Sequence, residues 1–290
     1  MVARRAGEKI TVMTMDDGAS GLEQQVDPDR PSLSRIYDHL LGGGHNFAAD
    51  RAVADAIMAV VPHYEVFVRA NRAFVHRAVL HMLTAGIEQF LDLGAGLGGV
   101  RHVHELAQAE RPQARVVYVD RDPVAIARLS LIAPQAYPGI GVLEADLRHV
   151  DEVLDHVVTA QVLDLTRPVG VVAGSVLPCL PDDEEVAATL AWYHERLAPG
   201  SLLAASHADA TLLGHELAAA VEARLARAGI TLVHRNRQQF AALLGPWQPH
   251  PDGVVPTGLW RPDGLAPPLP ESLWGNAVLA GHGHEPAGPA

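Results

Sequence analysis

The spacing of apolar residues changes near residue 87, and the change predicts two kinds of structure. Before that point apolar residues recur every three or four positions, the period of an amphipathic helix. After it, short apolar runs alternate with helical stretches, which indicates an α/β fold with a mostly parallel sheet. The expected helices of the first part cover about 33–41, 47–60 and 63–84. The expected strands of the second part are 89–93, 115–120, 141–146, 169–175 and 201–207, followed by two closing strands at 230–233 and 254–260.

This pattern divides the chain into four segments. Residues 1–27 are polar and aperiodic, and we expect them to be flexible. Residues 28–86 are expected to form a helical cap, and residues 87–262 an α/β domain with a sheet of seven mostly parallel strands and an antiparallel closing strand. Residues 263–290 are rich in proline and glycine, which predicts an extended or disordered tail.

Two features of the cap segment suggest that it faces a ligand. Gly42 to Gly44 separate the first two helices, and consecutive glycines often mark a hinge or a close backbone approach. Arg69, Arg72 and His76 follow one another at spacings of three and four, which places them on one face of the third helix. That face is either solvated or turned toward the ligand. We expect the cap to be mobile and to close over a ligand.

The most informative stretch is F-L-D-L-G-A-G-L-G-G, from Phe90 to Gly99. An apolar run that enters a glycine cluster predicts a buried strand and a tight turn against which a ligand can lie. The pattern G-x-G-x-x-G, which begins at Gly94, fits the dinucleotide fingerprint, so an NAD-binding oxidoreductase is one interpretation. Asp92, two residues before the first glycine, favours another one. With it the stretch resembles the first motif of class I methyltransferases, which bind S-adenosylmethionine.

Polar side chains lie at the ends of the expected strands: Asp92, Asp120, Asp146 and Ser175. Ligands of α/β sheets bind at the carboxyl ends of the strands, so this placement predicts a nucleoside site. Asp120 is the candidate acceptor for the ribose hydroxyls, and Asp146, with Leu147 beside it, for the adenine amino group. Asp92 is expected to organise the glycine turn or to reach the methionine ammonium indirectly, and Ser175 to lie near the methyl group. A helix cap or a surface acid is the alternative for Asp120.

Methyl transfer from a sulfonium is an in-line displacement, so the protein must align donor and acceptor and exclude water. A general base is needed only when the acceptor loses a proton during attack. The candidate bases are His207, His104, His45 and Asp38. A structural or surface role is open to each of them, and the sequence singles out none as catalytic.

Composition narrows the classes of partner. The formal net charge of −12 repels phosphate backbones, so we expect no nucleic acid partner. No apolar run approaches the roughly 18 residues of a membrane span, so we expect a soluble, cytoplasmic protein without membrane contact. Cys179 is the single cysteine and is expected to be a packed small residue. Neither His102 with His104 nor His282 with His284 has metal-ligand spacing in a rigid element, and no metal is expected.

Several longer motifs are more specific than the glycine turn. They include R-I-Y-D-H-L-L-G-G-G-H-N-F-A-A-D-R at Arg35 to Arg51, A-N-R-A-F at Ala70 to Phe74, V-V-Y-V-D-R-D-P at Val116 to Pro123, E-A-D-L-R at Glu144 to Arg148 and W-R-P-D at Trp260 to Asp263. In these motifs the chain resembles the S-adenosyl methyltransferase family of actinobacteria that was long catalogued as a domain of unknown function. The resemblance implies a Rossmann-like class I methyltransferase fold with a helical cap over the cofactor, S-adenosylmethionine. It supplies no acceptor.

One departure from the family pattern bears on turnover. Such proteins usually read V-L-H-F-V-P-D after the fourth strand, whereas this chain has Pro178 in place of the histidine. If that histidine acts as a base or orients a substrate in relatives, this chain lacks it. The departure bears on turnover rather than on cofactor binding.

The sequence therefore predicts a methyltransferase that uses S-adenosylmethionine, releases S-adenosylhomocysteine and acts on a small-molecule or protein acceptor. A non-catalytic module that binds the cofactor or its product is the alternative, and an oxidoreductase a weaker one. The oligomeric state is left open. The candidate cofactor contacts are Tyr37, Asn46, Arg69, Asp92, Gly94, Ala95, Gly96, Asp120, Arg121, Asp146, Leu147 and Ser175.

Overall fold

The fold is taken from a computed structural model of the 290-residue chain, which describes residues 10–13, 23–97, 101–136, 139–262 and 269–282. The strands are β1 Ile10–Met13, β2 Glu23–Val26, β3 Gln89–Leu93, β4 Arg115–Asp120, β5 Ile140–Glu144, β6 Gly170–Gly174, β7 Leu202–Ala208, β8 Gln248–Pro249, β9 Val255–Pro256 and β10 Gly275–Gly281. The helices are α1 Leu33–Leu40, α2 Ala48–Met58, α3 Tyr64–Thr84, α4 Val103–Glu110, α5 Pro123–Ala136, α6 Val150–Asp155, α7 Val157–Val162, α8 Asp183–Arg196, α9 Ala210–Leu213, α10 His215–Arg227 and α11 Arg237–Leu243. Three short 3₁₀ helices complete the set: η1 Leu177–Cys179, η2 Thr257–Leu259 and η3 Pro270–Leu273.

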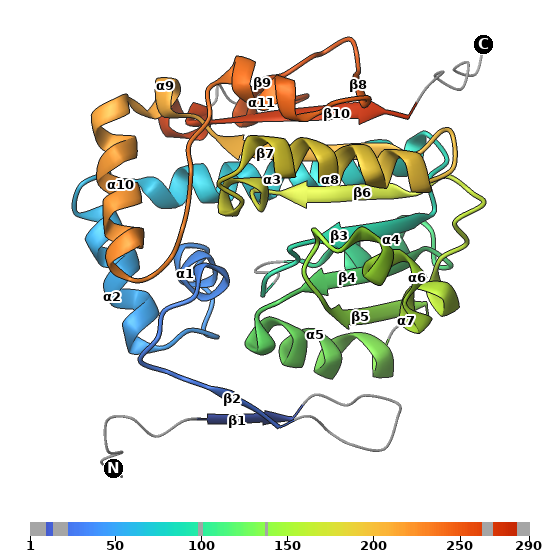
Figure 1. The fold of residues 1–290 in the computed structure, drawn as a ribbon, viewed down its shortest axis with the longest axis horizontal. Helices are drawn as coiled ribbons and strands as arrows, with labels where there is room; N and C mark the ends of the chain where they lie inside the picture. The colour runs from blue at the N-terminus through green and yellow to red at the C-terminus, as the bar shows by residue number, and fades with distance from the viewer. Residues whose placement is uncertain (1–9, 14–22, 98–100, 137–138, 263–268, 283–290) are drawn as a thin grey trace.

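An eight-stranded sheet forms the centre of the molecule, in the order β5-β4-β3-β6-β7-β10-β8, with β9 beside β10. Strands β3 to β7 pair in parallel, and β10 pairs antiparallel with β7. The prediction of a mostly parallel sheet with an antiparallel closing strand is confirmed. Strand order reverses between β3 and β6, and the parallel strands all end on the side where α1 lies (Figure 1).

Helices cover both faces of the sheet. Apolar residues of α6, α8 and α11 pack on one face, and apolar residues of α3, α4 and α5 pack on the other. A third cluster lies beyond the ends of the parallel strands (Figure 1). It contains apolar residues of α1, α2, α10 and the first turns of α3. Only the first part of α3 therefore belongs with the cap, because Phe74 to Leu83 pack in the core under the sheet. The predicted cap, 28–86, thus includes the part of α3 that packs against the sheet.

The closing strand was predicted in the wrong place. Residues 230–233 form no strand, since the amide of Val233 donates to the carbonyl of Pro178 and the segment packs beside η1. The second expected strand, 254–260, is reduced to the two residues of β9, where Pro256 has no N–H to continue the ladder. The closing strand is β10, within the segment predicted to be a tail. Its core positions are fully buried, and Gly275 lets it approach α3, because a Cβ there would lie 2.5 Å from the ring of Phe67.

The N-terminal segment contains one element that was not expected. Strands β1 and β2 form an antiparallel pair with Ile10 opposite Val26. Residues 1–9 and 14–22 of the segment 1–27 that was predicted to be flexible lie outside the described residues, as do Gly98 and Gly99 of the glycine cluster and His284 of the tail.

Candidate functional site

A cavity of about 760 Å³ opens where the parallel strands end. It is lined by the ends of β3, β4 and β6, by the residues that follow β5, and by α1 of the cap. The four polar residues predicted to gather at the strand ends, Asp92, Asp120, Asp146 and Ser175, all line it. The sequence was therefore correct about which side chains meet.

The turn after β3 brings backbone amides to this cavity. Gly94 has a φ of 69°, and a Cβ there would lie 2.3 Å from Cγ2 of Val176, so both backbone angle and packing require glycine. Gly96 also has a left-handed φ of 60°, and its amide donates a 2.7 Å hydrogen bond to Oδ2 of Asp120. Ala95 lines the cavity between them. A flat ligand can therefore approach the main chain here closely.

Asp120 is buried at the end of β4, and burial raises the pKa of its carboxyl. Its Oδ1 accepts from the amide of Asp122 at 2.8 Å, and its Oδ2 from Gly96. The backbone of Arg121 also donates to this carboxylate. A carboxylate has about four lone-pair positions, so at least one remains for a ribose hydroxyl. The geometry is compatible with the predicted ribose contact.

Asp92 has a different environment. It is only 5% exposed, and burial raises the pKa of its carboxyl to about 7, with Arg72 opposing the shift and Asp120 adding to it. Within the described residues no hydrogen bond reaches the Asp92 carboxylate. Arg72, also in the cavity lining, donates from Nη2 to the carbonyl of Arg101 at 2.7 Å, while its buried Nε has no partner in the described part of the chain. Buried polar atoms are almost always paired, so both groups are available to pair with a ligand in the cavity.

Asp146 is held by a neighbour. Arg148 donates from Nε to Oδ1 at 2.9 Å and from Nη2 to Oδ2 at 2.7 Å, and these bonds lower the pKa of Asp146 to about 2. Arg121 is exposed, and its Nη1 lies 3.9 Å from Oδ2 of Asp146. Asp146 is therefore ionised, and an adenine amino group would share its oxygens with Arg148. Leu147 is buried and lines the cavity beside it.

Ser175 adopts a left-handed φ of 60°, which is rare for a residue with a side chain and often marks a functional position. A hydrogen-bonded chain fixes it. The amide of Ser175 donates to Oγ of Ser206 at 3.0 Å, Ser206 donates to Oδ1 of Asn71, and Asn71 donates from Nδ2 to the hydroxyl of Tyr37 at 2.7 Å. Tyr37 and Asn71 line the cavity, so this chain connects the cap to the end of β6.

Two of the four candidate bases lie away from the cavity. His207 is buried in β7, where its Nε2 lies 3.0 Å from Nη1 of Arg235, and burial lowers its pKa to about 3. His104 is buried at the start of α4, with Nδ1 2.8 Å from the hydroxyl of Tyr118, and burial lowers its pKa. Neither lines the cavity, so both are core histidines here and the base role predicted for them is not supported by their positions.

The other two candidates lie in the cap. His45 is exposed and outside the cavity lining. Asp38 does line the cavity, but its Oδ2 accepts from the amide of His45 and from Nδ2 of Asn46, both at 2.9 Å. Asp38 therefore holds the glycine loop. Asn46 belongs to the same loop network and is not part of the cavity lining, contrary to its expected cofactor contact.

Helical phase also displaces an expected contact on α3. Arg69 is exposed and absent from the cavity lining, whereas Arg72, one turn later, lines it. The sequence had identified the stripe that contains both, but the phase of the helix is set by how Phe67 and Phe74 pack. Asn71 was not among the candidate site residues, although the A-N-R-A-F motif contains it. Its signal was a polar residue on the apolar side of an amphipathic helix.

The turn after β6 explains the place of Pro178. It lies buried in η1, and the residues of this turn that line the cavity are Ser175, Val176, Cys179 and those that follow. Pro178 itself faces away, with its carbonyl accepting from Val233 at 2.8 Å. Burial raises the pKa of Cys179 to about 12, which leaves its thiol protonated and unsuited to nucleophilic attack.

Among the residues that the structure describes, no group of three or more His, Cys, Asp or Glu side chains could hold a metal ion. Within the same ranges, no helix combines the length and apolarity needed to cross a membrane.

Comparison with known proteins gives the family context. A family model described as S-adenosyl methyltransferase matches residues 19–284. A solved structure of a DUF574 family protein from Streptomyces avermitilis has a TM-score of 0.81 and 29% identity, covering 88% of this chain and 98% of its own. A Thermobifida fusca structure with a provisional methyltransferase description has a TM-score of 0.79 and 34% identity, covering 87% of this chain and 95% of its own. No curated protein matches the chain.

Proposed function

The chain belongs to the S-adenosyl methyltransferase family, with that family's Rossmann-like fold and S-adenosylmethionine as cofactor, and from this premise we propose that it methylates a small molecule bound beneath the cap. The observation that carries the proposal is that Asp92 and Arg72 line one cavity with Asp120, and that neither the Asp92 carboxylate nor the buried Nε of Arg72 has a hydrogen-bond partner among the described residues. The methionine end of the cofactor carries an ammonium and a carboxylate, and its other end a ribose diol. The charges and vacant hydrogen-bond positions match these groups.

We assign the binding roles from this match. Asp92 accepts from the ammonium, Arg72 donates to the carboxylate, and Asp120 accepts from the ribose hydroxyls. Asp146 and Leu147 contact the adenine. When bound, the cofactor supplies an electrophilic methyl group on a sulfonium that is itself the leaving group. At Gly96, where a Cβ would meet nothing within 4 Å, the cofactor has room against the main chain.

The residues near the transfer point favour catalysis by alignment and exclusion of water. Ser175, held by Ser206 and Asn71, and Tyr37 from the cap border the same part of the cavity. No histidine lines this cavity among the described residues, so the proposed acceptor is a nucleophile that needs no histidine base. Because α1 contributes to the lining, the acceptor must fit under the cap, which favours a small molecule over a folded protein.

A non-catalytic module that binds the cofactor or its product is the second candidate. The absence of a histidine base from the described lining favours it. Methylation of any acceptor by the wild-type protein would exclude this candidate. No observation on the site favours the NAD-dependent oxidoreductase.

Calorimetric titration with S-adenosylmethionine, S-adenosylhomocysteine and NAD tests the cofactor site, followed by methyl-group transfer from labelled cofactor to a panel of small nucleophiles. We expect both adenosyl ligands to bind and NAD not to bind. Replacement of Asp92 by Asn should weaken both adenosyl ligands, whereas Glu144→Gln, an exposed acid at the end of β5, should leave them unchanged. Binding of NAD alone would refute the proposal.

A further inference from the structure

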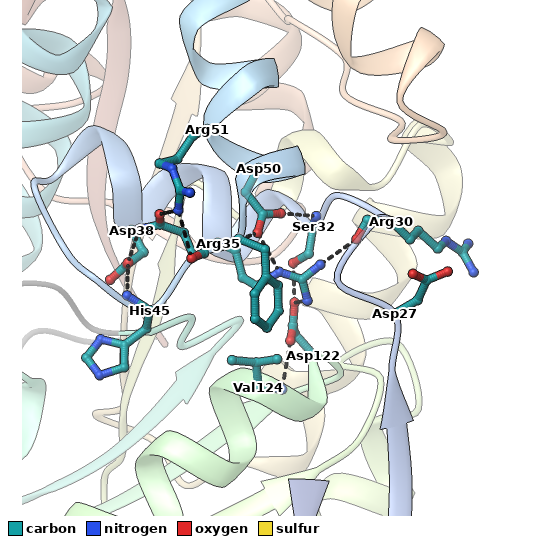
Figure 2. A network of polar contacts seen from close by, with 12 residues as sticks. Asp27, Arg30, Ser32, Arg35, Asp38, His45, Asp50, Arg51, Asp122 and Val124 are labelled. Carbon is teal, nitrogen blue, oxygen red and sulfur yellow. Dashed lines mark hydrogen bonds and ion pairs between the residues drawn. The ribbon is translucent and has the colours of Figure 1, made fainter. Parts of the chain in front are cut away.

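We propose that Arg35 is a positioning residue that couples closure of the cap to the ribose carboxylate, Asp120. The inference rests on the proposed function, because it assigns the ribose to Asp120. It concerns a network of contacts between the cap and the end of β4. This network is not assigned a direct role in aligning the methyl group. Figure 2 shows this network, with Arg35 between Asp50 of α2 and Asp122.

On the cap side, Arg35 and Asp50 form a buried ion pair. Arg35 is 4% exposed and Asp50 is 0% exposed, and Nε of Arg35 donates to Oδ2 of Asp50 at 2.9 Å. Asp50 also accepts from the amides of Ser32 at 2.9 Å and Phe47 at 2.7 Å. The guanidinium lies 5.1 Å from the centre of the Phe47 ring and donates to the carbonyl of Arg30. The entry to α1 and the start of α2 are thereby joined to a single arginine.

On the other side, the same guanidinium reaches the α/β domain. Nη1 of Arg35 lies 3.6 Å from Oδ2 of Asp122, and the hydroxyl of Ser32 donates to that same oxygen. Asp122 caps α5 by accepting from the amide of Val124 at 2.9 Å. Its own amide donates to Oδ1 of Asp120 at 2.8 Å. The contacts therefore run without a break from Asp50 through Arg35 and Asp122 to Asp120.

The charges of these residues indicate how the network would respond to movement of the cap. Asp50, Asp122 and Asp120 are three buried acids, and the guanidinium of Arg35 contacts the first two. A buried acid without its partner is strongly destabilising, so moving the cap away from β4 would leave Asp122 uncompensated beside Asp120. When the cap is closed, the guanidinium of Arg35 compensates the negative charge of Asp122. This reduces the repulsion between Asp122 and a charged Asp120. Ribose binding and cap closure should then stabilise each other, as linkage requires.

A purely structural role for Arg35 inside the cap predicts something different. Its bonds to Asp50 and to Arg30 would then suffice, and Asp122 would matter only as the cap of α5. The two possibilities separate in Asp122→Asn, which keeps the acceptor for Val124 but loses the charge that Arg35 meets. Arg224→Met is a matched control, because Arg224 of α10 also ties the cap to the body, through the carbonyl of Ala56 at 2.9 Å, away from Asp120.

The experiment compares wild type, Arg35→Met, Arg35→Lys, Asp122→Asn, the Arg35→Met/Asp122→Asn double variant and Arg224→Met. Calorimetry measures the Kd for S-adenosylmethionine, and hydrogen exchange measures protection of residues 32–62 with and without it. We expect Arg35→Met and Asp122→Asn each to weaken binding about tenfold and to lose cofactor-dependent protection of the cap. The double variant should bind no more weakly than either single variant. Arg35→Lys should recover part of the affinity, and Arg224→Met should bind as wild type.

Other outcomes overturn the proposal. Unchanged affinity and unchanged cofactor-dependent protection in Asp122→Asn would show that Arg35 serves the cap alone, as would additive losses in the double variant. An equal loss in Arg224→Met would show that any tether of the cap matters. Asp122→Asn also decides the question if Arg35→Met fails to fold. A wild-type protein that binds no S-adenosylmethionine would instead refute the proposed function, and the role of Arg35 with it.

Discussion

The amide of Gly96 donates a 2.7 Å hydrogen bond to Oδ2 of Asp120, so the turn after β3 and the end of β4 are fixed relative to each other before any ligand arrives. Asp120 thus serves two purposes in the proposed site. Its carboxylate orders the glycine turn, and the same residue lines the cavity. A substitution at Asp120 should therefore disturb both the ribose contact and the approach of the ligand to the main chain.

We expect Asp120→Asn to raise the Kd for S-adenosylmethionine by at least about tenfold, the equivalent of about 1.4 kcal/mol. The asparagine side chain carries no charge and has one acceptor oxygen in place of two, so fewer acceptor positions are left for the ribose diol and the Gly96 amide. Calorimetry measures the change, with S-adenosylhomocysteine as a second ligand that should weaken in parallel. Glu144→Gln, at the end of the neighbouring strand but outside the cavity lining, is the control. Equal affinity in Asp120→Asn and wild type would remove the ribose assignment.

Cofactor binding should weaken as pH falls through neutrality. Burial raises the pKa of Asp92 to about 7, and only the ionised carboxylate attracts an ammonium. Below that pKa the protonated fraction grows, so the association constant should fall by up to about tenfold per pH unit. His76 and His102, which lie near Arg72, have pKa values lowered to about 4 by burial and stay neutral in this range.

Calorimetry between pH 5.5 and 7.5 measures this dependence, with Asp92→Asn as the comparison because it has no proton to gain. Wild type should lose affinity across the range, while the variant should be weaker at pH 7.5 and nearly level. Parallel profiles for the two proteins would mean that another group controls binding.

The parallel strands of the fold could be predicted from the local pattern of apolar residues and glycines. The run from Phe90 to Leu93 into Gly94 predicted β3 and its turn, and β4 was placed with its correct bounds. Because strand ends converge in a parallel sheet, Asp92 and Asp120 could be placed in one site without knowing any contact. Local periodicity and a topological rule were sufficient there.

The rest depended on contacts between residues distant in sequence. Strand β10 lies in a stretch whose composition indicated a tail, and only its pairing with β7 and its packing against Phe67 make it a strand. The same limit applied to His207, because its partner Arg235 lies 28 positions further along the chain, just after the segment 230–233 that was expected to be a strand. Whether Arg69 or Arg72 enters the cavity is a matter of helical phase, which the long-range packing of α3 decides.

His207 should contribute to acid sensitivity. Its Nδ1 lies 2.9 Å from the carbonyl of Ala208 and so carries the proton, which leaves Nε2 to accept from Arg235. Burial lowers its folded-state pKa to about 3, below the unfolded value of 6.5. The unfolded chain therefore binds the proton more readily, and the stability conferred by neutral His207 is lost as pH falls from about 6.5 toward 3.

Urea unfolding of wild type and His207→Gln at pH 7 and pH 5 measures this contribution. The glutamine amide oxygen can accept from Arg235 but does not titrate. Wild type should lose about 2 kcal/mol more than the variant between the two pH values, from 1.4 kcal/mol per unit below pH 6.5. Identical losses would show that His207 is not a source of the acid sensitivity.

The glycine triplet offers a sharper test of why the cap loop has its sequence. A Cβ on Gly43 would lie 2.1 Å from Oδ1 of Asp38, and that carboxylate cannot easily move, since the amide of His45 and the side chain of Asn46 hold it. A Cβ on Gly44 would meet nothing within 4 Å, and Gly44 does not have a left-handed φ. The two neighbours therefore have opposite packing environments.

We expect Gly43→Ala to destabilise the protein by about 1–3 kcal/mol through overpacking. Gly44→Ala should be neutral or stabilising by up to about 1 kcal/mol, because alanine reduces the entropy of the unfolded chain. Urea unfolding measures both, and hydrogen exchange over residues 32–62 shows whether the loss in Gly43→Ala is confined to the cap. If the triplet acted only as a flexible hinge, the two substitutions would have similar effects. Since only Gly43 contacts Asp38, unequal effects would mean that one glycine is required for packing the cap over the cavity.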